Sequence, residues 1–334
     1  MIKTAISHQL AITLAGVLAL LVTSARADTF GSGGNAFTID FVTIGDPGNA
    51  NDNGTTDGSF SPYGGVSYTF QTGTYEISKD IINKANILGG LFITQFPWAR
   101  ESQPATFISW NEAARFVNWL NTSSGYPAAY KFAVNPGDMG YTSNAVANAN
   151  LVLWTPSDAG YDASNLYRNS NAHYFLPSAD EWYKAAFYSG SGNVYYNYAT
   201  GSDAIPTAVA SGTGAGTVVC GGVASVPADI TLAGGLSHYG TMGQAGNVYE
   251  WNESAITAPN DVTSENRALR GGAWGNTIYS LSSSFLYLLS GPPDYSASGI
   301  GFRVASVVPE PSSARLMFSA SLLALAWRRR RAAL

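Results

Sequence analysis

The chain of 334 residues has little cysteine and little charge. Cys220 is its only cysteine, so no disulfide can form within the chain, even in an oxidising compartment. Charged residues make up 12% of the sequence and apolar residues 46%, while Gly and Pro are frequent. This composition excludes a disulfide scaffold and disfavours a helical bundle. It predicts one loop-rich domain that a large apolar core stabilises.

The first 27 residues have the pattern of a secretory signal peptide. Lys3 precedes an uncharged apolar stretch from Leu10 to Val22, and Ala25-Arg26-Ala27 follows. Ala25 and Ala27 are small residues at the −3 and −1 positions before Asp28, and this pattern predicts cleavage by signal peptidase after Ala27. The alternative is an N-terminal anchor, but about 20 apolar residues are needed to span a bilayer.

The last residues combine three features in a fixed order. Pro309-Glu310-Pro311 comes first, an apolar stretch from Leu316 to Trp327 follows, and residues 328–331 are arginines. A basic cluster after an apolar segment is expected to stay on the cytoplasmic side of the membrane. This order resembles the PEP-CTERM sorting signal of Gram-negative bacteria. The resemblance implies export across the inner membrane, transient membrane contact through the C-terminal helix and cleavage by an exosortase near Pro309. A plain tail anchor is the alternative, although the apolar part is short for a permanent span.

The predicted organisation is a signal peptide at 1–27, one domain at 28–306 and a sorting signal at 307–334. Residues 28–308 contain 10 Lys and Arg and 21 Asp and Glu, a formal net charge of −11. An acidic surface disfavours nucleic acid as a partner. The expected location is the cell envelope, the cell surface or the extracellular matrix.

Several local patterns predict secondary structure. Apolar and polar residues alternate from Phe37 to Val42, which predicts a strand. A second strand is expected at 66–70, with a loop at 45–59 between them. This loop resembles the start of a calcium-binding EF-hand, but Phe60 stands where that loop needs a carboxylate.

Three helix starts can be placed from capping residues. Ser78 precedes a helix that Gly89-Gly90 ends. Ser109 with Glu112, and Ser178 with Glu181, form capping boxes, so both glutamates are interpreted as caps rather than as catalytic groups. Residues 199–225, rich in Ala, Thr, Gly and Ser, are expected to be an extended surface excursion.

Six sequence blocks occur in an order that resembles the sulfatase-modifying-factor family, which includes the formylglycine-generating enzymes. The blocks are Tyr75–Ser78, Pro104–Ala113, Phe175–Trp182, Gly246–Trp251, Leu269–Trp274 and Gly301–Ala305. The resemblance implies a loop-rich, single-domain α+β fold, a variant of the C-type lectin-like fold. Within the blocks, tryptophans supply buried area, and we expect Arg270 and Arg303 to donate charge-assisted hydrogen bonds.

The chain departs from the family at the catalytic positions. The resemblance places a copper-binding cysteine pair two and seven residues after Trp274, where this chain has Asn276 and Leu281. Neither side chain supplies the soft thiolate that copper(I) prefers, so formylglycine-generating oxidase chemistry is not expected. Another branch uses iron and a histidine-rich partner domain, but only His173 and His238 remain after the signal peptide.

Calcium is the one cofactor that the resemblance leaves open. The matching positions are Gly243, Gly246, Val248 and Glu250. Backbone carbonyls and a carboxylate suit a hard cation, although Gly243 has no side chain to offer. The alternative is that Glu250 pairs with an arginine or accepts hydrogen bonds from backbone amides.

The resemblance places a substrate groove at residues 275–298. The candidate ligand-binding residues there are Asn276, Tyr279, Ser283, Phe285, Tyr287 and Tyr295. Tyrosine with serine and asparagine is typical of binding surfaces, while an ordinary ordered loop is the alternative. We therefore expect an exported binding or structural module for a glycan, peptide or matrix component. The rival hypothesis is an enzyme of this superfamily with a divergent active site.

Overall fold

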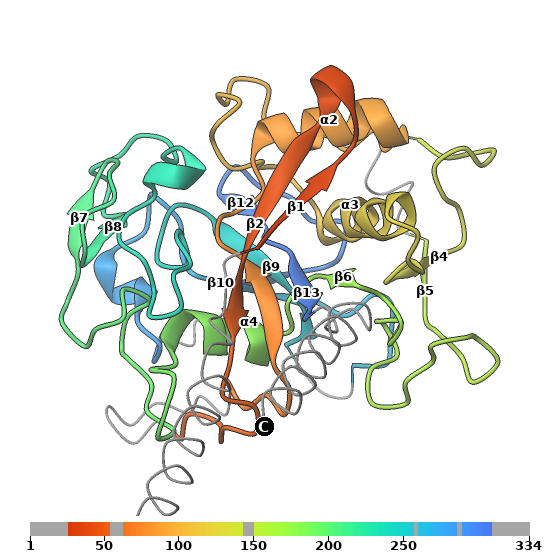
Figure 1. The fold of residues 1–334 in the computed structure, drawn as a ribbon. Coiled ribbons are helices and arrows are strands. Elements are labelled where there is room, and N and C mark those ends of the chain that lie inside the picture. The colour runs from red at the N-terminus through yellow and green to blue at the C-terminus, as the bar shows by residue number, and fades with distance from the viewer. Residues whose placement is uncertain (1–25, 54–62, 143–149, 257–259, 286–288, 309–334) are drawn as a thin grey trace, which may run out of the picture.

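The computed structural model describes residues 26–53, 63–142, 150–256, 260–285 and 289–308 (Figure 1). Tyr287, Pro309, Glu310 and Pro311, and the predicted signal peptide up to residue 25, lie outside the described residues. The strands are β1 (Arg26–Phe30), β2 (Phe37–Ile44), β3 (Phe70–Gly73), β4 (Lys131–Phe132), β5 (Leu151–Val152), β6 (Tyr174–Phe175), β7 (Thr207–Val209), β8 (Thr217–Val219), β9 (Tyr249–Ala255), β10 (Arg267–Arg270), β11 (Leu289–Gly291), β12 (Ile300–Gly301) and β13 (Ala305–Val307). The helices are η1 (Gly33–Asn35), α2 (Lys79–Gly89), α3 (Trp110–Ser123), α4 (Ala179–Phe187), η2 (Ile230–Leu232) and η3 (Ile278–Leu281). Among the helices within these ranges, none is long and apolar enough to span a bilayer.

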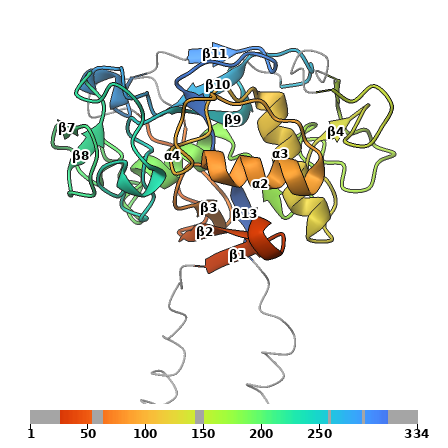
Figure 2. The ribbon, with the colours of Figure 1, turned by 90° about the horizontal axis from the view of Figure 1, so that it is seen from above.

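The two ends of the described chain lie in one sheet. Its strand order is β1-β2-β3-β13-β6, and every neighbouring pair is antiparallel. The predicted strand at 37–42 is confirmed as β2, which buries Phe37, Ile39 and Phe41 on one face. Because β1 and β13 share this sheet, the first and last described residues emerge at the same end of the molecule (Figure 2).

The second strand begins later than predicted. The expected strand at 66–70 is instead β3, which pairs with β2 from Phe70 onward and with β13 on its other side. Val66 is buried, but its carbonyl accepts the Gly48 N–H at 2.8 Å rather than joining the ladder. Partners far away in the sequence therefore set the limits of this strand.

The three predicted helices are confirmed. The Ser78 hydroxyl accepts the Ile81 N–H at the start of α2, and Gly90 ends that helix in the left-handed conformation. Reciprocal capping boxes begin α3 and α4, as the Ser-x-x-Glu spacing predicts. These caps satisfy backbone N–H groups that have no partner inside a helix.

Helix α3 lies between the first sheet and a second sheet of order β11-β10-β9-β12 (Figure 2). Its buried face joins the main core, which includes Phe41 of the first sheet and Trp251 of the second. Two indole N–H groups of this core donate to backbone carbonyls: Trp110 to Asn252 at 3.0 Å, and Trp251 to Ile108 at 2.8 Å. The α+β class predicted from the sequence is confirmed.

The predicted surface excursion at 199–225 is wrong in part. Val218, Val219 and Cys220 are almost completely buried. Small residues allow this close packing: a Cβ atom at Gly246 would lie 2.2 Å from the Val219 carbonyl oxygen. The segment therefore has an exposed part, which includes residues 203–205 and 213–215, and a buried part at residues 218–220.

Candidate functional site

The two positions that correspond to the family's cysteine pair have structural roles. The Asn276 side-chain oxygen accepts the Ala273 N–H at 2.7 Å, which closes a tight turn. Leu281 is 2% exposed and packs in a core cluster with Trp182 and Cys220. One side chain therefore stabilises a turn, and the other fills the interior.

Cys220 lies closer to this region than its sequence position suggests. The N–H of the next residue, Gly221, donates to the Asn276 carbonyl at 2.6 Å. The thiol is buried among apolar side chains, and this burial raises its pKa. Cys220 is therefore a protonated packing group at neutral pH.

The predicted groove residues do not surround one deep pocket. Ser283 and Phe285 line a cavity of about 30 Å³ with Arg270 and Leu281, which has room for little more than one water molecule. Tyr279 is 75% exposed and projects from η3. Phe285 and Tyr295 are also exposed, at 40% and 44%, so these three rings lie at the surface and not in an enclosed site.

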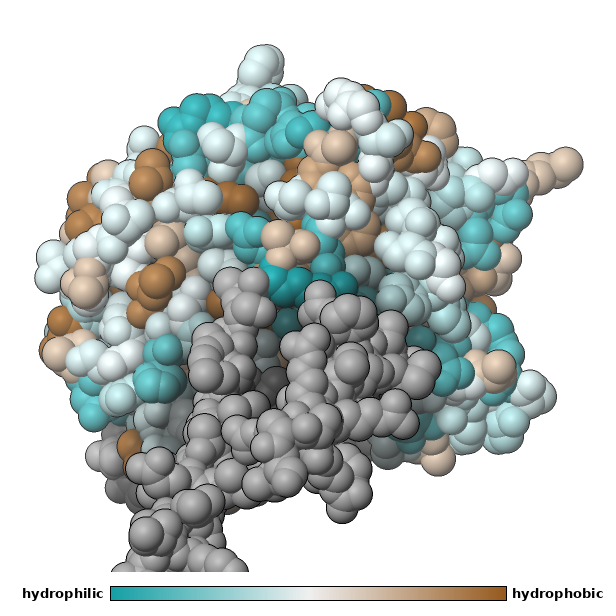
Figure 3. Space-filling view, viewed as in Figure 1, coloured by the Kyte–Doolittle hydropathy of each residue, from teal (hydrophilic) through white to brown (hydrophobic). Residues whose placement is uncertain are grey.

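Exposed apolar side chains are scattered elsewhere on the molecule. On the face seen in Figure 3, hydrophobic residues stand singly or in small groups among hydrophilic ones. Isolated surface hydrophobics of this kind are normal in soluble domains and mark no interface by themselves.

Glu250, the predicted side-chain ligand of calcium, belongs to a buried ion pair with Arg303. Both carboxylate oxygens of Glu250 accept hydrogen bonds from Arg303, each at 2.6 Å, and the Trp182 indole donates to the same carboxylate at 2.7 Å. Glu250 and Arg303 are both fully buried. A calcium ion here would share its only side-chain ligand with a guanidinium, so these residues fit a structural ion pair better than a calcium site. Calcium binding by these residues therefore stays a prediction.

A second carboxyl group, missed by the sequence reasoning, lies beside this ion pair. Glu76 is 2% exposed and accepts the Asn247 amide N–H at 2.6 Å. Burial, together with the negative charge of Glu250, raises the pKa of Glu76 well above its ordinary value, against the opposing effect of Arg303. Gly243 has a φ of 82°, and a Cβ atom there would lie 3.0 Å from the Glu76 carboxyl carbon, so both the backbone and this carboxyl group favour glycine at 243.

Replacing Glu76 with Gln is expected to flatten the pH dependence of stability. Because the pKa of Glu76 is raised in the folded state, the folded protein favours the protonated carboxyl group. The stability that Glu76 contributes is therefore complete at low pH, and it is lost as the pH rises above the unfolded pKa of about 4.3. Gln is neutral throughout, so we expect the melting temperature at pH 7 to rise by roughly 2–4 °C, with little change at pH 4. Thermal melts from pH 4 to 8 check this, with the exposed Glu101→Gln as the control. An equal loss of stability at both pH values would contradict it.

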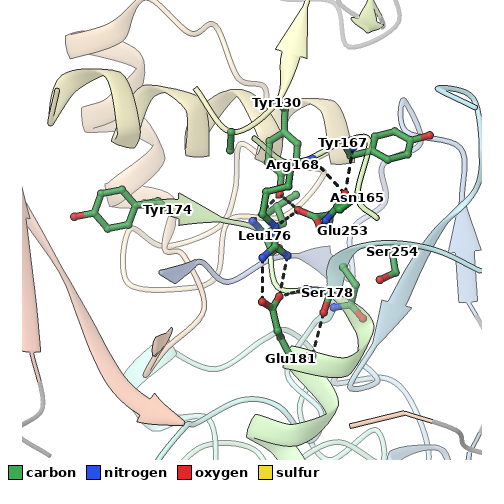
Figure 4. Close-up of polar contacts among 12 residues, drawn as sticks. Tyr130, Asn165, Tyr167, Arg168, Tyr174, Leu176, Ser178, Glu181, Glu253 and Ser254 are labelled. Carbon is green, nitrogen blue, oxygen red and sulfur yellow. Dashed lines mark hydrogen bonds and ion pairs between the residues drawn. The ribbon is translucent and has the colours of Figure 1, made fainter. Parts of the chain in front are cut away.

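A second buried ionic network joins α4 to β9 (Figure 4). Arg168 donates to both oxygens of Glu181, at 3.0 and 2.9 Å, and to Glu253 at 2.7 Å. Burial alone would raise the pKa of Glu181, but the charge and hydrogen bonds of Arg168 outweigh it, and this pKa lies below its ordinary value. The guanidinium also stacks 3.8 Å above the Phe175 ring. No sequence block contains Arg168, so only the fold reveals this network.

The remaining charged candidates have different surroundings. Arg303 donates to Glu250 and to backbone carbonyls, as expected. Arg270 instead lies over the Tyr63 ring, 4.3 Å from its centroid. His173 stacks on Tyr126, with ring centroids 4.5 Å apart. Among the described side chains, no group of three His, Cys, Asp or Glu could hold a metal ion.

Comparisons with known proteins identify the family and the fold. Residues 82–308 match the sulfatase-modifying factor enzyme 1-like domain. The fold is similar to that of Treponema denticola variable protein 1, with 18% identity over 85% of this chain and 99% of that chain, and a TM-score of 0.53. It is also similar to that of CarF, with 17% identity over 81% of this chain and 99% of that one, and a TM-score of 0.55. No curated protein matches the sequence.

The family match covers most of the chain, and the expected C-type lectin-like architecture is confirmed by the mixed sheets, the few helices and these structural neighbours. The chain belongs to the sulfatase-modifying factor enzyme 1-like family.

Proposed function

We propose that this protein is a binding or structural module rather than a formylglycine-generating oxidase. The observation that carries the proposal is the pair of roles taken by Asn276 and Leu281, one in a turn and one in the core. Copper(I) chemistry needs soft thiolate ligands. Cys220 supplies a single thiol, and its pKa is raised by burial, which disfavours the thiolate.

The two ends of the domain support a sorted, exported protein. Ala27 lies in β1, and cleavage after it would leave residues 28–30 to pair with β2. The predicted sorting signal begins at the end of β13, in the same sheet. This sheet lies at the opposite end of the molecule from β10 and β11 (Figure 2). A domain held in the cell envelope through its C-terminus would therefore present β10 and β11 outward.

We propose that the exposed aromatic rings of Tyr279, Phe285 and Tyr295 are the ligand contacts of this module. Tyr279 is 75% exposed, Tyr295 is 44% exposed and Phe285 is 40% exposed. Tyrosine rings give rigid contact area with a polar end at a small loss of conformational entropy. A glycan, a peptide or a matrix component is the proposed class of ligand.

Copper and oxygen measurements test the proposal. The purified protein is expected to bind no stoichiometric copper or iron and to consume no oxygen with thiol peptides. A formylglycine-generating enzyme with an intact cysteine pair is the positive control for the assay. Stoichiometric copper with turnover, both lost in Cys220→Ala, would overturn the proposal.

On glycan and peptide arrays, Tyr279→Ser is expected to weaken any specific binding, and unchanged binding would remove Tyr279 from the site.

A further inference from the structure

A cavity of about 440 Å³ lies between the end of α2 and one face of α3. The two helices lie side by side (Figure 2). Four of the residues that line the cavity are spaced three or four positions apart on α3 and therefore share one face of this helix: Arg115, Asn118, Trp119 and Thr122. Cavities of this size hold small ligands in other proteins.

Trp119 is the one aromatic residue among the described residues that line the cavity. It is partly exposed, and its ring packs against Phe30, Phe37 and Phe116. Its indole N–H donates to no atom of the described residues, and it is not sealed from solvent as the Trp274 N–H is. The ring therefore offers a fixed apolar surface with an accessible donor at its edge.

Gly89, which also lines the cavity, leaves the donor edge of this indole open. A Cβ atom at Gly89 would lie 2.5 Å from Trp119 Cδ1 and 2.7 Å from Trp119 Nε1. Gly89 does not have a positive φ, so the nearby indole and not the backbone favours glycine here. Any larger residue at this position would press against the edge that carries the N–H.

Hydrogen bonds hold the other walls of the cavity in place. The Asn118 amide donates to the Tyr130 carbonyl at 2.7 Å and accepts the Tyr130 N–H at 2.8 Å, which ties the loop after α3 to the helix. Arg115 donates to the Val134 carbonyl at 3.0 Å and to the Asn150 side-chain oxygen at 2.7 Å. The cavity is therefore formed before a ligand arrives, which lowers the entropic cost of binding.

The lining offers hydrogen bonds but little charge. No Asp, Glu, Lys or His is among the described lining residues. Arg115 is 3% exposed, and its guanidinium lies 4.0 Å above the Phe132 ring, so its charge faces the protein interior. Thr122 and Asn135 are exposed and contribute a hydroxyl and an amide. These groups suit a neutral ligand that both donates and accepts hydrogen bonds.

We propose that this cavity binds a neutral pyranose unit of a glycan. The flat C–H face of the sugar contacts Trp119, one hydroxyl oxygen accepts the indole N–H, and other hydroxyls bond to Thr122 and Asn135. A pyranose has an apolar face with hydroxyls around its edge, and the lining is complementary to both.

The lining favours a sugar over a peptide. No described lining residue belongs to a strand, so the cavity offers no sheet edge to an extended peptide. This inference rests on the proposed function as a binding module. It narrows the ligand to a glycan and places the contacts away from Tyr279.

Titration of the full-length protein, followed by calorimetry and by saturation-transfer NMR, tests the site. The probes are the methyl glycosides of glucose, mannose, galactose and N-acetylglucosamine, together with the trisaccharides of the same sugars. Sorbitol, which has hydroxyls but no ring, and an acetylated Pro-Leu-Pro peptide amide are the comparison compounds. We expect saturable binding of at least one sugar at millimolar concentration and no binding of either comparison compound.

Thr122→Tyr places a large side chain at an exposed position that lines the cavity, and it should weaken sugar binding at least about tenfold. Ser123→Tyr, the next exposed position of α3 and not a lining residue, is the matched control and should leave the affinity unchanged. Trp119→Phe keeps a ring but removes the N–H, and it should weaken binding about threefold to tenfold. Circular dichroism checks that each variant folds, and if Thr122→Tyr does not fold, Trp119→Phe decides the test.

The variants also separate this site from the aromatic rings of the proposed function. Binding that Thr122→Tyr abolishes and Tyr279→Ser retains supports the cavity and removes Tyr279 as the glycan contact. Binding that Tyr279→Ser abolishes and Thr122→Tyr retains overturns the cavity and leaves the proposed function in place. The inference is also overturned if no sugar saturates, or if sorbitol or the peptide binds instead, and the copper and oxygen measurements then still decide the proposed function.

Discussion

Replacing Arg303 with Met is expected to lower the free energy of unfolding by about 3–5 kcal/mol, because breaking a buried ion pair leaves an uncompensated charge. Arg303 is completely buried and donates to both oxygens of Glu250 and to the carbonyls of Gly73 and Met242. Met preserves much of the side-chain volume but donates nothing. The melting temperature should therefore fall by roughly 10 °C.

The exposed ion pair of Arg100 and Asp229 is the matched control. Arg100 reaches Asp229 at 2.5 Å, but its side chain is 62% exposed. Pairs of this kind contribute about 1 kcal/mol or less, so Arg100→Met should change the melting temperature little. In the double variant Arg303→Met with Glu250→Gln, part of the lost stability should return. If Arg303→Met were no more destabilising than Arg100→Met, the buried ion pair would not be a major source of the protein's stability.

Local sequence signals were sufficient to predict the helices. A helix start depends on a hydroxyl and a carboxylate three residues apart, and both partners lie within the same turn. Ser109 with Glu112, and Ser178 with Glu181, form these contacts as predicted. Glu181 also shows the limit of the local signal, because its second partner, Arg168, lies on a separate loop.

Strand limits and burial depended on distant partners. Phe70 begins β3 because β2 and β13 lie on either side of it, and β13 comes more than two hundred residues later. Val219 is buried because Gly246 lets another part of the backbone approach it. No pattern within a short window contains this information.

The family blocks indicated part of the candidate site. Glu76, Glu250 and Arg303 each lie in a quoted block, so the resemblance pointed to the segments that form the buried ion pair. The raised pKa of Glu76 could not be predicted, because it arises from burial and from the proximity of Glu250.

A second large effect is expected at Arg168, which neutralises part of the charge on two buried carboxylates. The side chains of Glu181 and Glu253 are 0% and 2% exposed, and Arg168 bonds to each of them. Replacing Arg168 with Met removes these bonds and should lower the free energy of unfolding by about 3–5 kcal/mol. Chemical denaturation followed by circular dichroism measures this change, and Lys84→Met, which breaks the surface pair with Asp80 on α2, should cost about 0.5 kcal/mol or less.

The pH dependence of the same variant distinguishes lost charge pairing from lost packing. The folded-state pKa of Glu181 is lowered by Arg168, so its contribution is present above the unfolded pKa of about 4.3 and is lost as pH falls. Without Arg168, that acid-dependent loss should shrink, and the double variant Arg168→Met with Glu181→Gln should be more stable than Arg168→Met alone. An equal destabilisation at pH 4 and pH 7 would mean that Arg168 acts through its contact with Phe175 and not through its charge.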